Sequence, residues 1–583
     1  MIELKFSEII NQNKELENKL QSSPFRITIL SNIIVHQIKE ILEYSLREKG
    51  INANVKFGNY DNIVQDSHIH NQSNAVIIFW ELCNVIEGLQ YKIGVLDKNE
   101  LDDILEMTKS EIDLVLKQFE KTSLVLINRF TSLPFSNYNI RKNNMEELAE
   151  LLNSYLEEKS SPNLKLVDID KIIASVSVDN SVDLRFFYSS KALYSIDFFK
   201  AYSLFVKPFF MSANGNAKKA LIFDCDNTLW NGILGEDGFN NIEMSTSTNK
   251  GRIFAEIQSI ALELNNQGIL IGICSKNNPK DVDEVIEFHP DMLLRKEYIA
   301  VNKSNWSDKV TNLQNIAQEL NIGLDSLVFI DDSSFEVNMI REKLPAVTAL
   351  QVPGKLHEYP KMLREKKSLF YNLSSTIEDK TKIKMYKQQT KREASKKDFN
   401  DIEDYLSALE LKLTIYEDDE TIIPRMSQMS QKTNQFNLTT KRYTEADIKN
   451  FIDAPDYDVY AFSAIDKFGD NGITGLSIIA VKNKNKIAEA EIDTFLMSCR
   501  VIGRNIEYRF IYEILNSIHA RGINKVRATY VPSEKNSQVE SFYKNVGFYE
   551  KKGNKEHNEY VLDLLNYNPK KIDYIKVTYR NDI

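Results

Sequence analysis

Short apolar runs alternate with segments of helical periodicity along the first third of the chain. The runs 25–30, 75–80 and 123–128 have the length and composition of buried strands, and the apolar spacing of 34–49 predicts a helix. Strands that alternate with helices in this order are typical of an α/β fold built on a mostly parallel sheet.

The same alternation returns after a turn-rich boundary at 211–217. The runs 220–223, 269–275 and 326–332 predict the strands of a second α/β unit. The lysine-rich stretch that follows is either a connecting helical arm or a solvated linker. We therefore expect five segments: an N-terminal α/β domain at 1–215, a second α/β domain at 216–354, a helical connector at 355–411, a third α/β domain at 412–567 and a polar tail at 568–583.

Composition narrows the class of protein. The net charge is −10, from 73 basic and 83 acidic residues, and the basic residues are dispersed, which argues against a nucleic-acid surface. The sequence has no long uninterrupted apolar window and no signal-peptide pattern, so we expect no membrane association. Four cysteines without a CxxC pair do not form a disulfide framework. We expect a cytoplasmic protein.

The strand predicted at 220–223 ends in two carboxylates, Asp224 and Asp226, followed by the hydroxyl of Thr228. Residues two apart in a strand point the same way, so both carboxylates are expected on one side of the sheet at its carboxyl edge. Acids this close repel each other unless a cation lies between them, and Mg²⁺ prefers oxygen ligands. The pattern predicts phosphoryl chemistry that uses Mg²⁺.

Three downstream segments supply the other groups that such chemistry needs. Ser275 ends the run 269–275, Lys309 begins a helical stretch, and Asp331 and Asp332 end the run 326–332. A carboxylate that attacks phosphorus needs a metal ion to screen its charge, hydroxyl and ammonium groups to hold the phosphate oxygens, and an acid for the leaving group. Each of these groups follows a predicted strand of the same unit.

This unit resembles a haloacid dehalogenase superfamily phosphatase. The resemblance implies that Asp224 is the nucleophile and Asp226 the general acid and base. It also implies that Thr228, Ser275 and Lys309 bind the phosphate. The implied Mg²⁺ ligands are Asp224, Asp226 through its backbone carbonyl, Asp331 and Asp332. The gaps between these motifs are too short for a large cap domain, which suits a bulky or protein-borne substrate.

The third α/β domain resembles a GNAT acyltransferase. The segment Arg500-Val-Ile-Gly503-Arg504 precedes a predicted helix, and backbone amides at a helix N-terminus bind phosphate. The resemblance implies that Arg500, Gly503 and Arg504 bind the phosphate end of a pantetheine arm. Asn536 would contact that arm and Tyr543 would protonate the leaving thiolate. Asn505 stands where this family has Gly or Ala, so a carrier-protein phosphopantetheine, with one phosphate, is an alternative to coenzyme A.

The order of the domains and five motifs together resemble the FkbH-like family. The motifs are NTLWNGILGEDG at 227–238, CSKN at 274–277, QKTNQFNLTT at 431–440, FGDNG at 468–472 and SCRVIGR at 498–504. The resemblance implies that the enzyme takes D-1,3-bisphosphoglycerate, a phosphorylated three-carbon acid, removes phosphate and loads the glyceryl group onto an acyl carrier protein for polyketide-type biosynthesis. Dephosphorylation is assigned to the second domain and thioester formation to the third.

A covalent glyceryl-cysteine intermediate is one route for this transfer. Cys499 lies beside Arg500 at the predicted helix start, an electropositive setting that lowers the pKa of a thiol. Cys274 lies next to Ser275, but strand alternation points it away from the phosphate. We therefore expect Cys499 to be the catalytic thiol, with a buried structural cysteine as the alternative.

The N-terminal domain resembles an SGNH hydrolase, with Ser31 at the position of the nucleophile. The usual Gly-Asp-Ser and Asp-x-x-His motifs are absent, and a serine without its base is a poor nucleophile. We expect a noncatalytic scaffold or carrier-docking domain. Two other functions compete with the favoured one. The chain could be an N-acyltransferase of sugar or amino-acid metabolism with an associated phosphatase, or a docking protein with a vestigial site.

Overall fold

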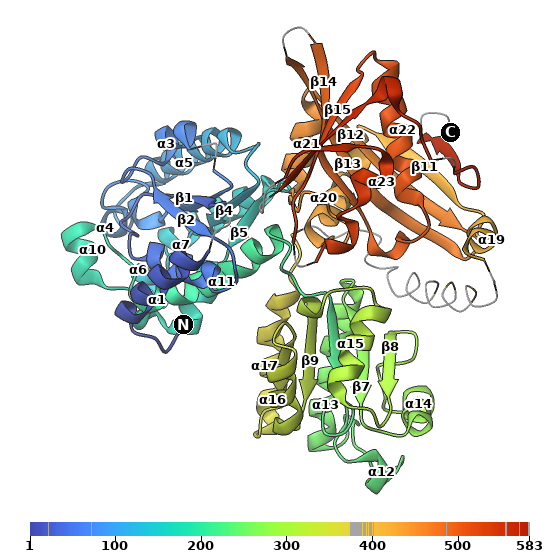
Figure 1. Cartoon of the computed structure of the whole chain (residues 1–583). Helices are drawn as coiled ribbons and strands as arrows, with labels where there is room; N and C mark the ends of the chain where they lie inside the picture. The colour runs from blue at the N-terminus through green and yellow to red at the C-terminus, as the bar shows by residue number, and fades with distance from the viewer. Residues whose placement is uncertain are drawn as a thin grey trace. The chain divides into compact units, whose positions relative to one another are not determined.

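The computed structural model describes residues 1–20, 23–70, 73–373, 388, 392, 395, 399, 401–484, 487–533, 535–553, 557–570 and 572–580. The contacts divide the chain into two compact units (Figure 1). The first comprises Met1–Asn214 with Tyr443–Asn450, and the second comprises Gly215–Arg442 with Phe451–Ile583. Among the described helices, none combines the length and the apolar character needed to cross a bilayer.

The first unit contains a five-stranded parallel sheet of order β2-β1-β3-β4-β5. The three runs expected as strands form β1, β3 and β4, so the α/β prediction is confirmed here. The strands are β1 (Phe25–Ser31), β2 (Ala53–Phe57), β3 (Ala75–Phe79), β4 (Leu124–Asn128) and β5 (Leu164–Val167). The longer helices are α1 (Phe6–Lys19), α2 (Ile38–Arg47), α3 (Ile63–Ile69), α5 (Lys98–Gln118), α7 (Asn144–Glu158), α8 (Ile169–Val176), α10 (Leu184–Ser190) and α11 (Ile196–Ala213).

The second unit begins with another parallel sheet, of order β10-β9-β6-β7-β8. Its strands are β6 (Ala220–Phe223), β7 (Leu270–Ser275), β8 (Ile299–Ser304), β9 (Leu327–Asp331) and β10 (Thr348–Gln351). Alternate residues of β6 enter different cores, with Leu221 and Phe223 in one and Ala220 and Ile222 in the other. The sheet is therefore buried on both faces, as continuous apolar strands require.

Helices connect these strands. They are α12 (Leu234–Asp237), α13 (Asn249–Asn266), α14 (Pro279–Phe288), α15 (Lys309–Glu319), α16 (Ser334–Lys343) and α17 (Tyr359–Lys366). The sequence pattern placed α17 in the helical connector, and here the structure differs. Tyr359, Leu363 and Phe370 are buried in the core of this domain, because the charged residues of α17 occupy its other face. Most of the remaining connector lies outside the described residues.

The C-terminal part of the second unit is an eight-stranded sheet of order β16-β17-β15-β14-β13-β12-β11-β18. Only β14 with β15 and β11 with β18 are parallel pairs. The strands are β11 (Lys412–Glu417), β12 (Tyr457–Asp466), β13 (Gly469–Lys484), β14 (Ile487–Met497), β15 (Lys525–Tyr530), β16 (Tyr549–Gly553), β17 (Asn558–Asp563) and β18 (Lys576–Tyr579). The helices are α19 (Ile402–Ser407), α20 (Ile423–Lys432), α21 (Glu445–Asp453), α22 (Ile506–Ala520) and α23 (Phe542–Val546). Strand β18 lies within the stretch expected to be a polar tail.

Candidate active site

The candidate active site lies at the carboxyl edge of the sheet β10-β9-β6-β7-β8. The chain passes from β6 to β7 and β8 on one side and later to β9 and β10 on the other, so its connections change direction between β6 and β9. Ligands of open α/β sheets bind at such a switch point, beyond the carboxyl ends of the strands. Asp224 follows β6 and Asp331 ends β9, so the two carboxylates flank this point.

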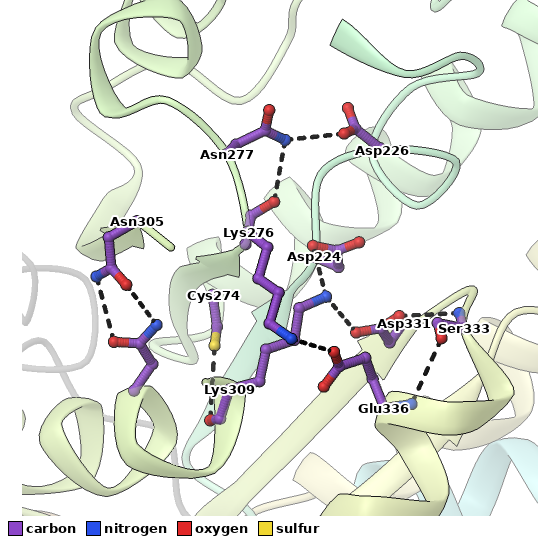
Figure 2. A network of polar contacts seen from close by, with 12 residues as sticks. Asp224, Asp226, Cys274, Lys276, Asn277, Asn305, Lys309, Asp331, Ser333 and Glu336 are labelled. Atoms are coloured by element: carbon purple, nitrogen blue, oxygen red, sulfur yellow. Dashed lines mark hydrogen bonds and ion pairs between the residues drawn. The ribbon is translucent and has the colours of Figure 1, made fainter. Parts of the chain in front are cut away.

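Lys309 joins these two carboxylates (Figure 2). It is the first residue of α15, and its Nζ lies 3.0 Å from Oδ1 of Asp224 and 2.6 Å from Oδ2 of Asp331. All three side chains are buried. Burial alone would lower the pKa of Lys309, but the two aspartates raise it well above its usual range, so the ammonium stays charged.

Burial also governs the carboxyl groups. It raises the pKa of Asp224 to about 7, with Lys309 lowering it and Asp331 raising it further. Burial, together with Asp331, likewise raises the pKa of Asp332. Both aspartates are therefore held in a setting that opposes their negative charge. A cation beside them would favour the ionised form.

Three of the predicted metal ligands converge. Asp224, Asp331 and Asp332 each offer a carboxylate oxygen, and these oxygens lie within 4.8 Å of one another. Oxygen-only donors in a buried acidic cluster match the coordination preferences of Mg²⁺. The side chain of Asp226 is not part of this cluster, which agrees with an expected contribution through its backbone carbonyl only. The residues present fit a Mg²⁺ ion.

The predicted phosphate-binding hydroxyls flank the carboxylates. Ser275 ends β7 and is buried, and its hydroxyl lowers the pKa of Asp224. Thr228 is fully buried, and its Oγ1 has no hydrogen-bond partner within the described ranges. A buried hydroxyl without a partner is rare in folded proteins and points to an absent ligand atom. The structure thus brings Asp224, Ser275, Thr228 and Lys309 together around a place for an anion.

Asp226 is held apart from the metal cluster by partners that sequence reasoning did not assign, of which Figure 2 shows Asn277. Its Oδ1 accepts hydrogen bonds from Trp230 Nε1 and from the backbone N–H of Leu234, both at 3.0 Å. Its Oδ2 accepts one from Nδ2 of Asn277 at 2.9 Å, and the same amide nitrogen donates to Ser275 Oγ at 3.2 Å. Trp230 lies in the NTLWNG motif and Asn277 in the CSKN motif, so these two motifs were the sequence signal that could have identified the partners of Asp226.

Cys499 lines a cavity of about 80 Å³ in the second unit. Its thiol is half-buried, and the cavity wall also includes Lys219, Arg425 and Arg500. The sequence predicted a lowered thiol pKa here, and the structure differs: burial raises the pKa of the Cys499 thiol, and Lys219 and Arg500 only reduce that rise. Nδ2 of Asn321 donates a hydrogen bond to the Cys499 carbonyl at 2.8 Å. The loop that carries Cys499 is therefore fixed against the sheet that carries Asp224.

The phosphatase residues and Cys499 lie at opposite edges of that sheet. Lys219 and Leu270, which line the Cys499 cavity, stand at the amino ends of β6 and β7, whereas Asp224 and Ser275 stand at the carboxyl ends. Lys219 and Asp224 are five residue steps apart along an extended chain, which corresponds to roughly 16 Å. A substrate of a few carbon atoms cannot contact both sites at once.

In the loop expected to bind a pantetheine phosphate, Arg504 is already paired with groups of the protein itself. Arg504 is buried, and its Nη1 lies 3.0 Å from Asp466 Oδ2 while its Nη2 donates to the Arg500 carbonyl at 2.6 Å. Arg392 binds the same Asp466 carboxylate through two nitrogens. Gly503 has a φ of 80°, which its lack of a side chain permits. The Arg504 charge is thus compensated inside the fold.

The two other residues expected at the pantetheine arm are enclosed. Asn536 and Tyr543 are both fully buried, Asn536 after β15 and Tyr543 in α23. Burial raises the pKa of Tyr543 well above its usual range. In the first unit, the Ser31 hydroxyl donates to the carbonyl of Ile33 at 2.6 Å and accepts from its N–H at 3.1 Å. Neither Asn536 nor Tyr543 lines the Cys499 cavity.

One solved structure matches most of this chain. It is the N-terminal part of the protein BF1531 from Bacteroides fragilis, which contains a phosphatase domain and is complexed with Mg. The identity is 25%, the match covers 64% of this chain and 100% of that chain, and the TM-score is 0.55. This likeness confirms the expected α/β architecture and the fold of a haloacid dehalogenase-type phosphatase domain.

Two acetyltransferases match a smaller part. The ribosomal-protein-S18-alanine N-acetyltransferase from Escherichia coli has 13% identity, covers 26% of this chain and 94% of its own, and has a TM-score of 0.21. A spermidine N-acetyltransferase mutant from Vibrio cholerae has 14% identity, covers 27% and 95%, and has the same TM-score. The comparisons with protein-family models and with curated proteins gave no match.

Proposed function

We propose that this chain is a bifunctional enzyme, a Mg²⁺-dependent phosphatase joined to an acyltransferase. It takes D-1,3-bisphosphoglycerate, removes phosphate and loads the glyceryl group onto the phosphopantetheine thiol of an acyl carrier protein in the cytoplasm. The observation that carries the phosphatase half is the buried set of Asp224, Lys309, Asp331 and the unpartnered Thr228 hydroxyl. The Mg-bound phosphatase domain in the similar Bacteroides fragilis protein supports it.

The phosphatase step uses Asp224 as the nucleophile. A carboxylate oxygen of Asp224 attacks phosphorus, the bond from phosphorus to the ester oxygen breaks, and that oxygen takes a proton from Asp226. Water then attacks the aspartyl phosphate, with its proton passing to Asp226, which releases inorganic phosphate and restores both aspartates. Thr228, Ser275 and Lys309 hold the phosphate oxygens. Mg²⁺, held by Asp224, Asp331, Asp332 and the Asp226 backbone carbonyl, supplies charge neutralisation for the phosphate when it is bound.

The acyl-transfer step is assigned to Cys499. The Cys499 sulfur attacks the carbonyl carbon of the acyl phosphate as the thiol gives up its proton, the bond from that carbon to the phosphate oxygen breaks, and the leaving phosphate takes up the proton. The carrier thiol then displaces the Cys499 sulfur in a thioester exchange, which restores the enzyme thiol. Lys219 and Arg500 lie in the wall of the same cavity, and their positive charges favour the thiolate against burial, which raises the net pKa of the thiol. Arg500 and Gly503 are assigned to the phosphate end of the carrier arm.

The test of the thiol assignment compares two cysteine variants. Carrier loading is measured by intact mass for the native chain, for Cys499→Ser and for Cys274→Ser. Cys274 is the matched control, because it is fully buried and its Sγ faces the Lys309 carbonyl at 3.9 Å. We expect Cys499→Ser to abolish loading and Cys274→Ser to retain it. Full loading by Cys499→Ser would remove Cys499 from the mechanism.

The test of the phosphatase assignment is phosphate release from a simple phosphate ester. We expect Asp224→Asn, or removal of Mg²⁺ with a chelator, to lower the rate by at least about 10³-fold, since both the nucleophile and its charge neutralisation would be lost. An Asp224→Asn variant with native phosphate release would overturn the assignment.

A further inference from the structure

The C-terminal sheet has a place where two neighbouring parallel strands separate. Strand β14 pairs with β15 over three residues only, from Ala490 with Val526 to Ile492 with Ala528. Beyond this point β14 continues to Met497 and β15 to Tyr530 without pairing to each other. Main-chain groups that lose their strand partner must find another one, because an unpaired buried N–H or C=O is costly. Other groups must therefore pair with β14 and β15 in this gap.

The chain itself fills the gap, with residues 436–438, which we name the inserted segment. The N–H of Leu438 donates to the Phe495 carbonyl at 3.2 Å, and the N–H of Met497 donates to the Phe436 carbonyl at 3.0 Å. On the other side, the N–H of Val531 donates to the Leu438 carbonyl at 2.8 Å. Asn437 forms an antiparallel bridge with Leu496. The inserted segment thus acts as a short strand between β14 and the end of β15.

Asn536 fixes the inserted segment and has no capacity left for a ligand. Its Nδ2 donates to the carbonyls of Asn437 and Val531, both at 2.9 Å. Its Oδ1 accepts from the N–H of Ser533 at 2.8 Å and from the hydroxyl of Tyr530 at 3.1 Å. A side-chain amide has two donors and two acceptor lone pairs, so all four are used.

Side chains close the gap from both ends of the inserted segment. The ring of Phe436 packs edge-on against the ring of Phe542, with centroids 5.4 Å apart. The ring of Phe495, whose carbonyl accepts from Leu438, has its centroid 5.1 Å from that of Phe542. Asn437 is fully buried, and its Oδ1 accepts from the N–H groups of Thr439 and Thr440.

We infer that the gap between β14 and β15 is closed by the chain's own inserted segment, so that neither coenzyme A nor a phosphopantetheine arm enters there. Asn536 is a structural residue of this closure rather than a ligand of the arm. An arm that entered would have to replace three main-chain hydrogen bonds and the Asn536 bond together. The inference refines the proposed function, because it removes this gap as the route for a thiol donor.

Amide hydrogen exchange of the full chain tests this directly. The amides of Leu438, Met497 and Val531 are expected to exchange at least about a hundredfold more slowly than in an unstructured peptide, because each donates inside the sheet. Coenzyme A at millimolar concentration is expected to leave their rates unchanged. Fast exchange across 436–438, or slower exchange when coenzyme A is added, would overturn the inference.

A variant of the inserted segment gives a second test of the closure. Asn437→Ala removes the side-chain bonds to Thr439 and Thr440 and is expected to speed exchange at Leu438 by roughly tenfold, since about 1.4 kcal/mol of local stability corresponds to that factor. Slow exchange of the amides that pair β12 with β13 reports whether the C-terminal sheet of the variant is folded. If it is not folded, Thr439→Val, which removes the contact with Thr494, replaces the variant. An unchanged rate in a folded variant would contradict the closure. Because exchange does not require carrier loading, a failed transfer reaction leaves this result interpretable.

Discussion

The acidic cluster at the carboxyl edge of β6 and β9 is not neutral by itself. Asp224, Asp331 and Asp332 bring three carboxylates together, and Lys309 supplies a single positive charge beside them. Two negative charges then remain in a buried place, and one divalent cation balances them. The negative charge of Asp331 adds to the effect of burial in raising the pKa of Asp224. The uncompensated negative charge explains why the site fits Mg²⁺.

Lys309 is expected to stabilise the fold as well as the phosphate. Lys309→Met leaves Asp224 and Asp331 buried without their ammonium, which should lower the free energy of unfolding of the metal-free chain by about 3–5 kcal/mol. Mg²⁺ should reduce this loss. Urea denaturation with and without Mg²⁺ measures it. The control is Lys303→Met, whose partner Glu319 is more exposed, with an expected effect below about 1 kcal/mol. Equal stability of native chain and Lys309→Met would contradict the charge argument.

Glu81 in the first unit gives a pH-dependent prediction. Burial raises its pKa from 4.5 to about 8, although the nearby Tyr194 hydroxyl lowers it. The folded state therefore favours the protonated acid. This stability is fully present below the unfolded-state pKa and is lost as the pH rises through about 8, at up to about 1.4 kcal/mol per pH unit.

Glu81→Gln cannot ionise, so its stability should fall less than that of the native chain between pH 5 and pH 8. Hydrogen exchange of the β3 amides at both pH values measures the difference. Parallel losses in both proteins would show that Glu81 does not titrate in this window.

At the scale of elements, a buried cluster of ion pairs around Asp466 holds the loop between β14 and α22. Asp466 ends β12 and binds Arg504 from that loop together with Arg392. The loop conformation, with positive φ at Gly503 and Asn505, is thus anchored to the sheet. Arg504 is part of this anchor, which explains why its charge does not face a ligand.

Asp466→Asn tests the anchor. It leaves two guanidinium groups buried without their carboxylate and should lower the free energy of unfolding of the C-terminal domain by about 3–5 kcal/mol. Asp458→Asn is the matched control, because its partner Arg521 is 39% exposed and the expected loss is below about 1 kcal/mol. Urea denaturation followed by fluorescence compares them. Equal losses would mean that the Asp466 group is not a structural anchor.

The elements that could be predicted from sequence share one property. Strands β6, β7 and β9 are buried on both faces, so each appears as a continuous apolar run that ends in its functional residue. Helix α17 falls within the predicted helical connector, but its packing in the domain core was not predicted, and strand β18 was not predicted at all. Each has charged or polar residues on its exposed side and only a few buried ones. The bond between Asn437 and Asn536 joins residues 99 positions apart, and no local pattern records it.

Across the whole second unit, the two proposed reactions are separated by the length of a strand. Asp224 lies beyond the carboxyl end of β6, and the Cys499 cavity includes Lys219 at its amino end. A three-carbon substrate cannot span this distance. The acyl group must therefore be dephosphorylated and transferred in separate binding events, and a variant of one site should leave the other reaction working.

The most direct test is the intact mass of a phosphopantetheinylated carrier protein after incubation with the enzyme, Mg²⁺ and freshly generated 1,3-bisphosphoglycerate. We predict a glyceryl adduct with the native chain. With Asp224→Asn we predict a phosphoglyceryl adduct, because transfer at Cys499 would continue without dephosphorylation. No adduct from the native chain, with phosphate still released from other esters, would contradict the transfer half of the account and direct attention to amine acceptors.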